Sequence, residues 1–272
     1  MTRINSITIG EIEIIALTDG ATQFGAELFP DTEESVITDI LNNAGAKAID
    51  TNFNAFLVKS DGNTMLVDAG PRDLFGDTCG FLGEALAEAG VAHHDITHLY
   101  FTHLHPDHIA GALTPQGQAV FTNAQMFVSQ ADYAFWSKQV FTDDTLSQWQ
   151  ALAQACIAAY AGCTDLVEEG DRLIRGVTAL DLAGHTPGHM GFRADDGSDS
   201  FIHAGDIVHA PALQLINPEI SIVFDIDRDT ARNTRKRTLD MVATDGIKLS
   251  GGHFLQPNIG TLSRTGKGFV FS

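Results

Sequence analysis

Residues 102–111 read THLHPDHIAG, and this stretch constrains the fold more strongly than the composition does. It places His103, His105, Asp107 and His108 directly after the apolar run ITHLYF, which has the residues typical of a strand. Histidines at positions i and i+2 on a loop that leaves a strand can both turn toward one ion. Together the side chains offer more ligands than one tetrahedral ion takes from a single loop. The stretch therefore predicts a site for two metal ions.

Further candidate ligands follow apolar runs later in the chain and lie among glycines, which let the backbone approach a site closely. They are His185 and His189 in DLAGHTPGHMGF, His203, Asp206 and His209 in FIHAGDIVHA, and His253 in LSGGHFLQP. Each of them alone could be an ordinary loop residue. As a set with the first cluster, they predict that the ends of several strands converge on one metal centre.

The hydrophobic pattern predicts both strands and helices. Apolar and polar residues alternate over residues 6–17 and on both sides of the Asp61-Gly62 turn, as in hairpins. Helical patterns cover roughly residues 34–45, 81–90, 130–160 and 228–246, whereas residues 19–32 contain several breakers and are predicted to be a loop. Because no linker-like composition separates these segments, we expect a single domain over residues 1–272.

The composition of the chain argues against some classes of binding partner and against a membrane location. The formal net charge of −19 disfavours nucleic-acid backbones and anionic lipid surfaces. No apolar run is long enough to predict a membrane span, and the first residues lack the apolar core of a signal peptide. The cysteines have no CxxC spacing and are expected to be reduced thiols, which fits a cytoplasmic protein. The basic residues 228–237 are predicted to form a solvated helix face.

The motifs LVDAG, THLHPDH, GHTPGH, AGD and GGHF occur in this order, and on them the chain resembles the metallo-β-lactamase superfamily of metallohydrolases over roughly residues 5–270. The resemblance implies an α/β fold, an αββα sandwich of two mixed sheets flanked by helices, with the metal site at one edge. It also implies the ligands of each ion. These are His103, His105 and His185 for one ion, Asp107, His108 and His253 for the other, and Asp206 between them.

The same resemblance implies that Asp68 and His189 orient the ligands, although Asp68 could instead be the turn residue that closes its hairpin. A ligand set of imidazoles and carboxylates suits Zn²⁺, with Mn²⁺, Co²⁺ or Fe²⁺ as alternatives. At position 105 the oxygen-reducing diiron relatives carry a carboxylate, and at position 206 the antibiotic-degrading branch carries a cysteine. Both differences argue against those branches.

A finer similarity is to the lactonase and methyl-parathion-hydrolase-like branch, through HLHPDHIAGAL, DYAFW, GHTPGHMGF and GDIVHAPALQLINPEISIVFDID. It implies a metal-dependent hydrolase that cleaves a small-molecule lactone or carboxylic ester, acyl-homoserine lactones included, with a hydroxide held between two divalent ions. Relatives of this kind are often dimers, and the sequence leaves open whether this chain forms a homodimer.

In this branch Asp107 and Asp206 are expected to be catalytic as metal ligands. His209 occupies a position where one group of quorum-quenching lactonases has a catalytic tyrosine. We expect His209 to stabilise the oxyanion or to protonate the leaving alkoxide, and the alternative is a loop histidine without a catalytic role.

Aromatic residues near the motifs are candidates for the wall of the substrate pocket. Phe135 and Trp136 lie on a predicted helical insertion, and Phe24 and Phe29 lie in the early loop. The alternative for each is packing in the core, because aromatic residues at helical spacing are common there.

Other functions stay open at this stage. The same dimetal site could serve a phosphotriesterase or a phosphodiesterase, or a thioester hydrolase of the glyoxalase II kind. A metal-binding protein without catalytic activity is the remaining alternative, and a panel of ester, lactone and phosphotriester substrates would separate these classes.

Overall fold

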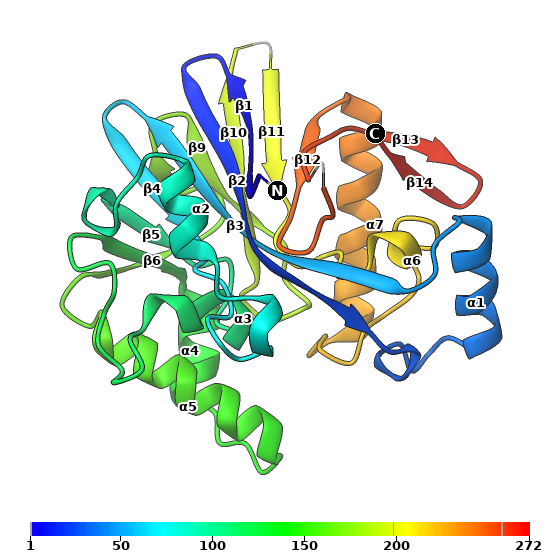
Figure 1. Ribbon diagram of the computed structural model, residues 1–272, viewed down its shortest axis with the longest axis horizontal. Helices are drawn as coiled ribbons and strands as arrows, with labels where there is room; N and C mark the ends of the chain where they lie inside the picture. The colour runs from blue at the N-terminus through cyan, green and yellow to red at the C-terminus, as the bar shows by residue number, and fades with distance from the viewer. Residues whose placement is uncertain (1, 198, 257) are drawn as a thin grey trace.

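The computed structural model describes residues 2–197, 199–256 and 258–272, and within these ranges the strands form two larger sheets and a small C-terminal hairpin (Figure 1). The first sheet contains, side by side in chain order, β1 (Ile4–Ile9), β2 (Ile12–Phe24), β3 (Ile49–Ser60), β4 (Asn63–Val67), β5 (His98–Tyr100), β6 (Gln125–Ser129) and β7 (Thr164–Val167). The second sheet has the order β12-β11-β10-β9-β8, with β8 (Arg172–Ile174), β9 (Val177–Asp181), β10 (Met190–Asp196), β11 (Asp199–His203) and β12 (Lys248–Ser250). The hairpin pairs β13 (Leu262–Thr265) with β14 (Gly268–Phe271).

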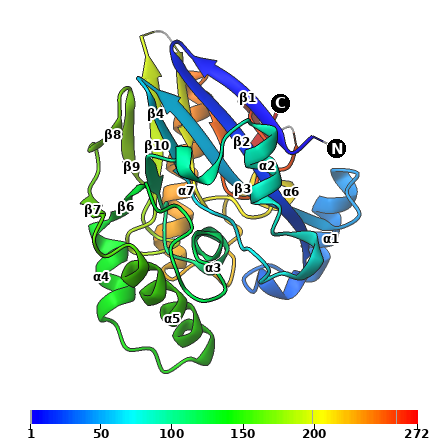
Figure 2. The same ribbon diagram turned by 60° about the vertical axis from the view of Figure 1, so that its left-hand side comes forward.

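Helices cover the outer faces of both sheets. They are α1 (Glu34–Asn43), α2 (Leu82–Glu88), α3 (Pro106–Ile109), α4 (Gln130–Lys138), α5 (Asp144–Ala159), α6 (Pro211–Gln214) and α7 (Arg228–Asp245), with short 3₁₀ helices at Ala26–Leu28, Gly76–Thr78, His93–Asp95 and Ala110–Ala112. Figure 2 shows α2 and α7 on opposite faces of the strands. None of the helices in the described ranges is long and apolar enough to cross a membrane.

The two-residue period of the strands builds the layers. On β3, Leu57 faces the core beneath α2, α4 and α5, whereas its neighbour Phe56 points the other way and packs with Phe201 of the second sheet. On the far side, Leu239 of α7 packs with Leu249 of β12. The order helices, sheet, sheet, helices is the predicted αββα sandwich. The sheets are mixed as predicted, because β4 to β7 pair in parallel and β1 to β4 antiparallel.

The predicted loop at residues 19–32 is wrong for its first part. A bulge between Thr18 and Gly20 lets β2 continue its pairing with β3 as far as Phe24. Gly20 is required by close packing, because a Cβ there would lie 2.3 Å from the Thr78 carbonyl oxygen. The glycine therefore marks a bulge and a close contact within a strand, where the sequence pattern indicated a break.

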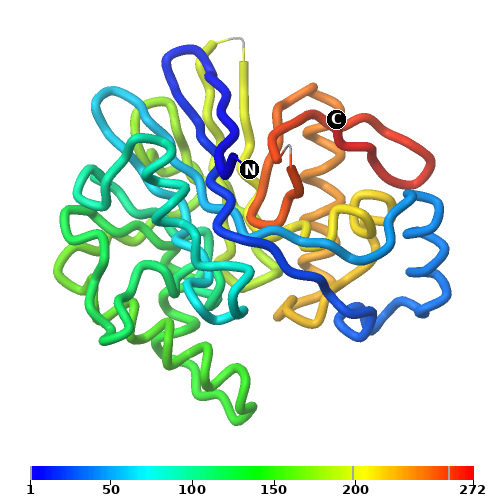
Figure 3. The backbone as a smooth tube through the Cα atoms, viewed as in Figure 1, coloured from blue at the N-terminus to red at the C-terminus, as the bar shows by residue number. Residues whose placement is uncertain are grey.

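The helical section predicted over residues 130–160 consists of two helices, α4 and α5. Asp143 begins the second one by accepting a hydrogen bond from the backbone N–H of Leu146 at 2.9 Å. Short strand β7 and the C-terminal hairpin were not predicted. In the backbone trace, helix α1 and the C-terminal end of β2 lie beside α6 (Figure 3). The segment of residues 19–43 is therefore packed against the second half of the chain.

Candidate metal centre

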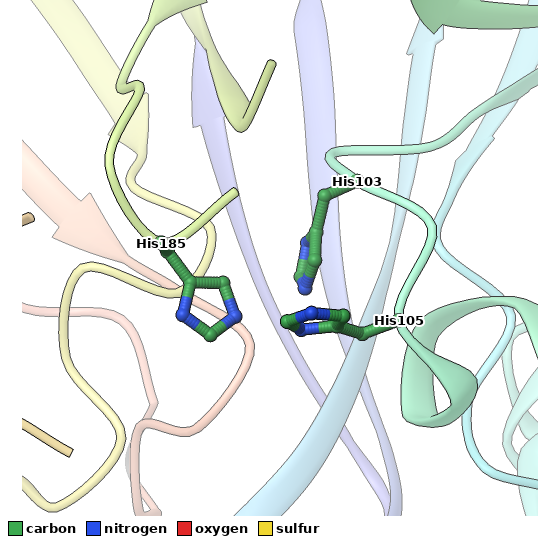
Figure 4. Close-up of side chains that lie close together, drawn as sticks. All are labelled: His103, His105 and His185. Atoms are coloured by element: carbon green, nitrogen blue, oxygen red, sulfur yellow. The ribbon is translucent and has the colours of Figure 1, made fainter. Parts of the chain in front are cut away.

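The structure brings together the seven ligands that the resemblance implied, which lie on segments that follow β5, β9, β11 and β12, with Asp107 and His108 on α3. One group of donor atoms, all within 4.8 Å of one another, comes from His103, His105 and His185. Figure 4 shows His103 and His105, from one loop, facing His185 from another. A second group comes from Asp107, His108, Asp206 and His253.

The Asp206 carboxylate lies at the centre and connects the two groups. Its Oδ2 lies 3.0 Å from the Nε2 atoms of both His108 and His253. The same oxygen lies 3.6 Å from Nε2 of His185 and 3.8 Å from Nε2 of His103. One carboxylate therefore faces imidazoles of both groups, which is the arrangement that a ligand shared by two ions requires.

Hydrogen bonds on the outer side of the rings determine which nitrogen faces the centre. Nδ1 of His253 donates to the Asn52 carbonyl oxygen at 2.8 Å, and Nδ1 of His185 donates to Asp225 Oδ1 at 2.9 Å. A neutral ring that donates through Nδ1 keeps the lone pair of Nε2 free. That lone pair points toward Asp206 in both histidines, as in a metal-binding imidazole.

The Asp68 carboxylate holds the first loop. Asp68 Oδ2 accepts hydrogen bonds from Nδ1 of His108 at 2.9 Å and from Oγ1 of Thr102 at 2.8 Å. Because the threonine hydrogen goes to Asp68, Thr102 Oγ1 accepts from Nδ1 of His103 at 3.0 Å. Asp68 therefore orients His108 directly and His103 through Thr102.

His189 lies behind the centre and holds the backbone of Asp206. Its Nδ1 donates to the Leu182 carbonyl oxygen at 2.9 Å, so its Nε2 is an acceptor and receives the backbone N–H of Asp206 at 2.9 Å. With both nitrogens bonded, His189 offers no free lone pair to an ion.

Several buried polar atoms at the centre have no hydrogen-bond partner within the described part of the chain. They are Nε2 of His103, His105 and His185, and Oδ1 of Asp206. An unsatisfied buried polar atom costs about 1–3 kcal/mol, so a cluster of them is expected only where something else binds. Neutral imidazoles beside a carboxylate are a donor set for divalent cations, and the residues fit two such ions.

The charges at the site suit metal binding. Burial lowers the pKa of His103, His105 and His185, and neighbouring imidazoles lower it further, so these rings are neutral near pH 7. Burial raises the pKa of Asp206, but the combined effect of His108, His253 and His209 outweighs it and holds the pKa well below its usual range. His103, His105 and His185 therefore present neutral imidazoles beside an ionised Asp206. Burial lowers the pKa of His108 and His253, but the neighbouring carboxylates, Asp206 above all, outweigh it and raise the pKa of both.

A cavity of ≈ 210 Å³ opens onto these donors. Its apolar wall consists of Phe24, Phe53, Phe75, Pro106, Trp149 and Phe224. Its polar floor consists of His105, Asp107, His185, Asp206, His209 and His253. Of the pocket residues predicted from the sequence, Phe24 lines the cavity.

The other predicted pocket residues lie elsewhere. Phe29 is fully buried in a cluster with residues of α1 and α6, because β2 carries the chain past the site before it turns. Trp136 is also fully buried, behind the ring of His105, and Phe135 packs against it. Both rings belong to or pack against the core cluster that α4 shares with α5, and α5 presents Trp149 to the cavity instead.

Some residues at the site carry no sequence signal that marks them. Phe53, Phe75 and Phe224 reach the cavity from a strand and two loops, with no periodic pattern in common. Asp225 does lie in a segment on which the finer resemblance rested, but its contact with His185 spans 40 residues. Conversely, the candidate ligand His203 stacks on Phe192 between the sheets, with ring centroids 5.3 Å apart, and belongs to neither donor group.

Comparisons with known proteins agree with this geometry. The profile of the metallo-beta-lactamase superfamily matches residues 156–253, and the profile of the anti-Pycsar protein Apyc1 matches residues 41–140. A search of curated proteins gave no significant match.

Solved structures match over nearly the whole chain. AidC, a dizinc quorum-quenching lactonase, is 26% identical with a TM-score of 0.93, and the match covers 99% of this chain and 96% of AidC. AbOPH, a hydrolase in the beta lactamase superfamily, is 28% identical with a TM-score of 0.92 over 100% of this chain and 97% of its own. A probable metal-dependent hydrolase from Staphylococcus aureus, 20% identical with a TM-score of 0.81 over 98% of this chain and 99% of its own, shares the fold.

The fold, the donor groups and these similarities define a metal-dependent hydrolase. Residues 156–253 match the metallo-beta-lactamase superfamily, and over nearly its whole length the chain is similar to AidC and to AbOPH, a hydrolase of that superfamily.

Proposed function

We propose that this protein hydrolyses an uncharged lactone or carboxylic ester, using two divalent metal ions, with Zn²⁺ as the expected metal. The observation that carries the proposal is the cavity, which joins a floor of metal donors to a wall of aromatic side chains. An ester group over the floor would place its apolar acyl or alkyl part against that wall. The similarity to AidC, a lactonase, supports the same class.

The proposed ligands of one ion are His103, His105 and His185, and those of the other are Asp107, His108 and His253, with Asp206 shared. Two divalent ions held there would lower the pKa of a bound water molecule and would polarise the substrate carbonyl. The side chains of the protein position the metal ligands and the substrate. Asp68, Thr102 and Asp225 hold the imidazoles through Nδ1, and the aromatic wall limits access of bulk water.

His209 is the proposed hydrogen-bond donor to the reacting oxygen. Its ring lines the cavity, and its Nε2 lies 3.3 Å from Asp206 Oδ2. Because Nε2 faces a carboxylate and the buried Nδ1 has no partner in the described ranges, we place the hydrogen on Nε2. Gln214 fixes the backbone of His209 by accepting its N–H at 2.7 Å. From this position His209 can donate to the oxyanion or to the leaving alkoxide.

Apart from the two ions, the cavity offers an anionic substrate no cationic side chain among its described residues. Its lining residues include Asp107 and Asp206 but neither lysine nor arginine, and the whole chain has a formal charge of −19. A phosphodiester keeps a negative charge that this lining leaves without a cationic side chain. Neutral phosphotriesters fit the same wall, so phosphotriesterase activity is the second candidate.

A substrate panel tests the proposal with the zinc-loaded protein. We expect kcat/KM for N-hexanoyl homoserine lactone or p-nitrophenyl acetate to exceed that for anionic bis(p-nitrophenyl) phosphate by at least about 100-fold. This factor corresponds to a difference of about 2.7 kcal/mol in the activation free energy. Paraoxon tests the second candidate. Chelation should abolish turnover, and added Zn²⁺ or Mn²⁺ should restore it. Faster hydrolysis of the diester, or full activity after exhaustive chelation, would contradict the proposal.

A further inference from the structure

Arg235 of α7 is fully buried, although it lies in the basic stretch that the sequence indicated to be a solvated helix face. That prediction is wrong for this residue. Its neighbours Lys236 and Arg237 are exposed, as predicted. A guanidinium stays charged at any ordinary pH, so its burial requires partners that satisfy its N–H groups.

The partners of Arg235 all lie between Ile207 and Asp225. Nε donates to the Ile207 carbonyl oxygen, and Nη1 donates to the carbonyl oxygens of Pro218 at 3.0 Å and Ile220 at 2.8 Å. Nη2 lies 3.5 Å from Oδ2 of Asp225, whose side chain is also fully buried. The planar guanidinium of Arg235 therefore contacts both ends and the middle of the segment of residues 207–225 and holds them together.

The fastened segment leads to the metal centre at both ends. Ile207 follows Asp206, the carboxylate that faces both donor groups. Asp225 accepts the Nδ1 hydrogen of His185 at 2.9 Å through its other oxygen. A continuous chain of contacts thus runs from Arg235 through Asp225 to His185, and a second one runs through the backbone of Ile207 to Asp206.

A second buried side chain strengthens the same segment. Gln214 donates from Nε2 to the Ile220 carbonyl oxygen at 3.1 Å, the oxygen that also accepts from Arg235. Its Oε1 accepts the backbone N–H groups of His209 and Ala210. Displacement of Arg235 would therefore loosen the loop that carries His209 as well.

We propose that Arg235 is a positioning residue of the metal centre, which fixes residues 206–225 so that Asp206 and His185 face the shared metal position. The inference rests on the proposed function only in taking these two residues as ligands. Arg235 acts through other residues, because its partners are the segment's carbonyl oxygens and Asp225.

Zinc affinity of the whole protein, measured by competition with a chromophoric chelator, tests the proposal. We expect Arg235→Met to weaken the binding of at least one zinc ion about 10- to 100-fold, as the loss of an outer ligand partner does elsewhere. Arg235→Lys should recover part of the affinity, because it restores the charge without the planar fork. Arg237→Met, the same change at an exposed position of the same helix, should leave zinc affinity unchanged.

Asp225→Ala keeps the test decisive if Arg235→Met does not fold. It should weaken zinc binding by a similar factor, and in a double variant that folds the two losses should be less than additive, since both act on His185. The absorption spectrum of the cobalt-substituted protein should change in either variant, which a loss of stability alone would not produce. Unchanged zinc affinity in Arg235→Met, or in Asp225→Ala where the first variant is unfolded, overturns the proposal. Failure of the unmodified protein to bind zinc would overturn the proposed function instead.

Discussion

At the scale of single residues, the destination of each Nδ1 hydrogen distinguishes the histidines of this site. His185 and His253 give that hydrogen to an outer acceptor and turn Nε2 inward, whereas His189 uses both nitrogens in hydrogen bonds to the backbone. In the sequence, these three histidines look alike as candidate ligands. Only the three-dimensional contacts separate an imidazole with a free lone pair from one that holds the loop.

The proposed role of His209 predicts a loss of turnover without a loss of metal. His209→Ala should lower kcat for a lactone or ester by about 10²- to 10³-fold, because a donor to the developing oxyanion is removed. Zinc content and KM should change little. Steady-state kinetics together with metal analysis of the purified variant provide the measurement.

The alternative for His209 is that it binds a metal ion, since its donor atom also groups with those of His185 and Asp206. Loss of one zinc equivalent in His209→Ala would favour that alternative. Unchanged kcat would show a loop histidine without a catalytic role, which the sequence left open.

The sequence marked the residues whose donor atoms the structure brings together, but it missed Asp225 and Arg235 behind them, and the reason is local. His103, His105, Asp107 and His108 are recognisable because they are close together in the chain and follow a strand. Arg235 is separated from the residues that it orients by tens of positions, and helical spacing alone suggested solvent exposure. Long-range polar contacts of this kind leave no periodic pattern.

At the scale of elements, α5 supplies the aromatic ring that the sequence analysis expected from the α4 segment. Helix α4 begins at Ser129, whose hydroxyl accepts the Asp132 N–H at 3.0 Å and donates to the Gly188 carbonyl oxygen. This fixes α4 against the loop of His185 and turns Trp136 into the core. Helix α5, which begins at Asp143, places Trp149 on the cavity wall.

These positions predict opposite effects for two tryptophan substitutions. Trp149→Ala should raise KM for esters with bulky apolar groups more than for small ones, with little change in stability. Trp136→Ala should lower the free energy of unfolding by about 3–5 kcal/mol, as expected for a fully buried aromatic side chain. Denaturant unfolding and KM for a series of acyl chain lengths measure both effects. A selective KM effect in Trp136→Ala with unchanged stability would contradict the assignment.

At the scale of the whole molecule, the metal donors come from both sheets. The segment of residues 103–108, which runs into α3, follows β5 of the first sheet, whereas His185, Asp206 and His253 follow strands of the second. The family resemblance predicted the sandwich, and the alternation of apolar residues predicted its strands, each of which displays one row to the helices and one row to the other sheet. The order of strands within each sheet depends on contacts between distant segments, and no single-sequence pattern shows it.

A centre shared by both sheets predicts that metal binding stabilises the entire molecule. At a free zinc concentration about 1,000 times Kd, binding adds about 4 kcal/mol to the free energy of unfolding. For a chain of this size, that corresponds to a rise in Tm on the order of 10 °C. Scanning calorimetry of the chelated and zinc-loaded protein should show one transition that moves as a whole, as expected for a single domain. Asp206→Asn, which removes the shared carboxylate charge, should reduce the rise. Two transitions, of which only one moves with zinc, would show that the halves of the chain unfold independently and that the ions do not join them.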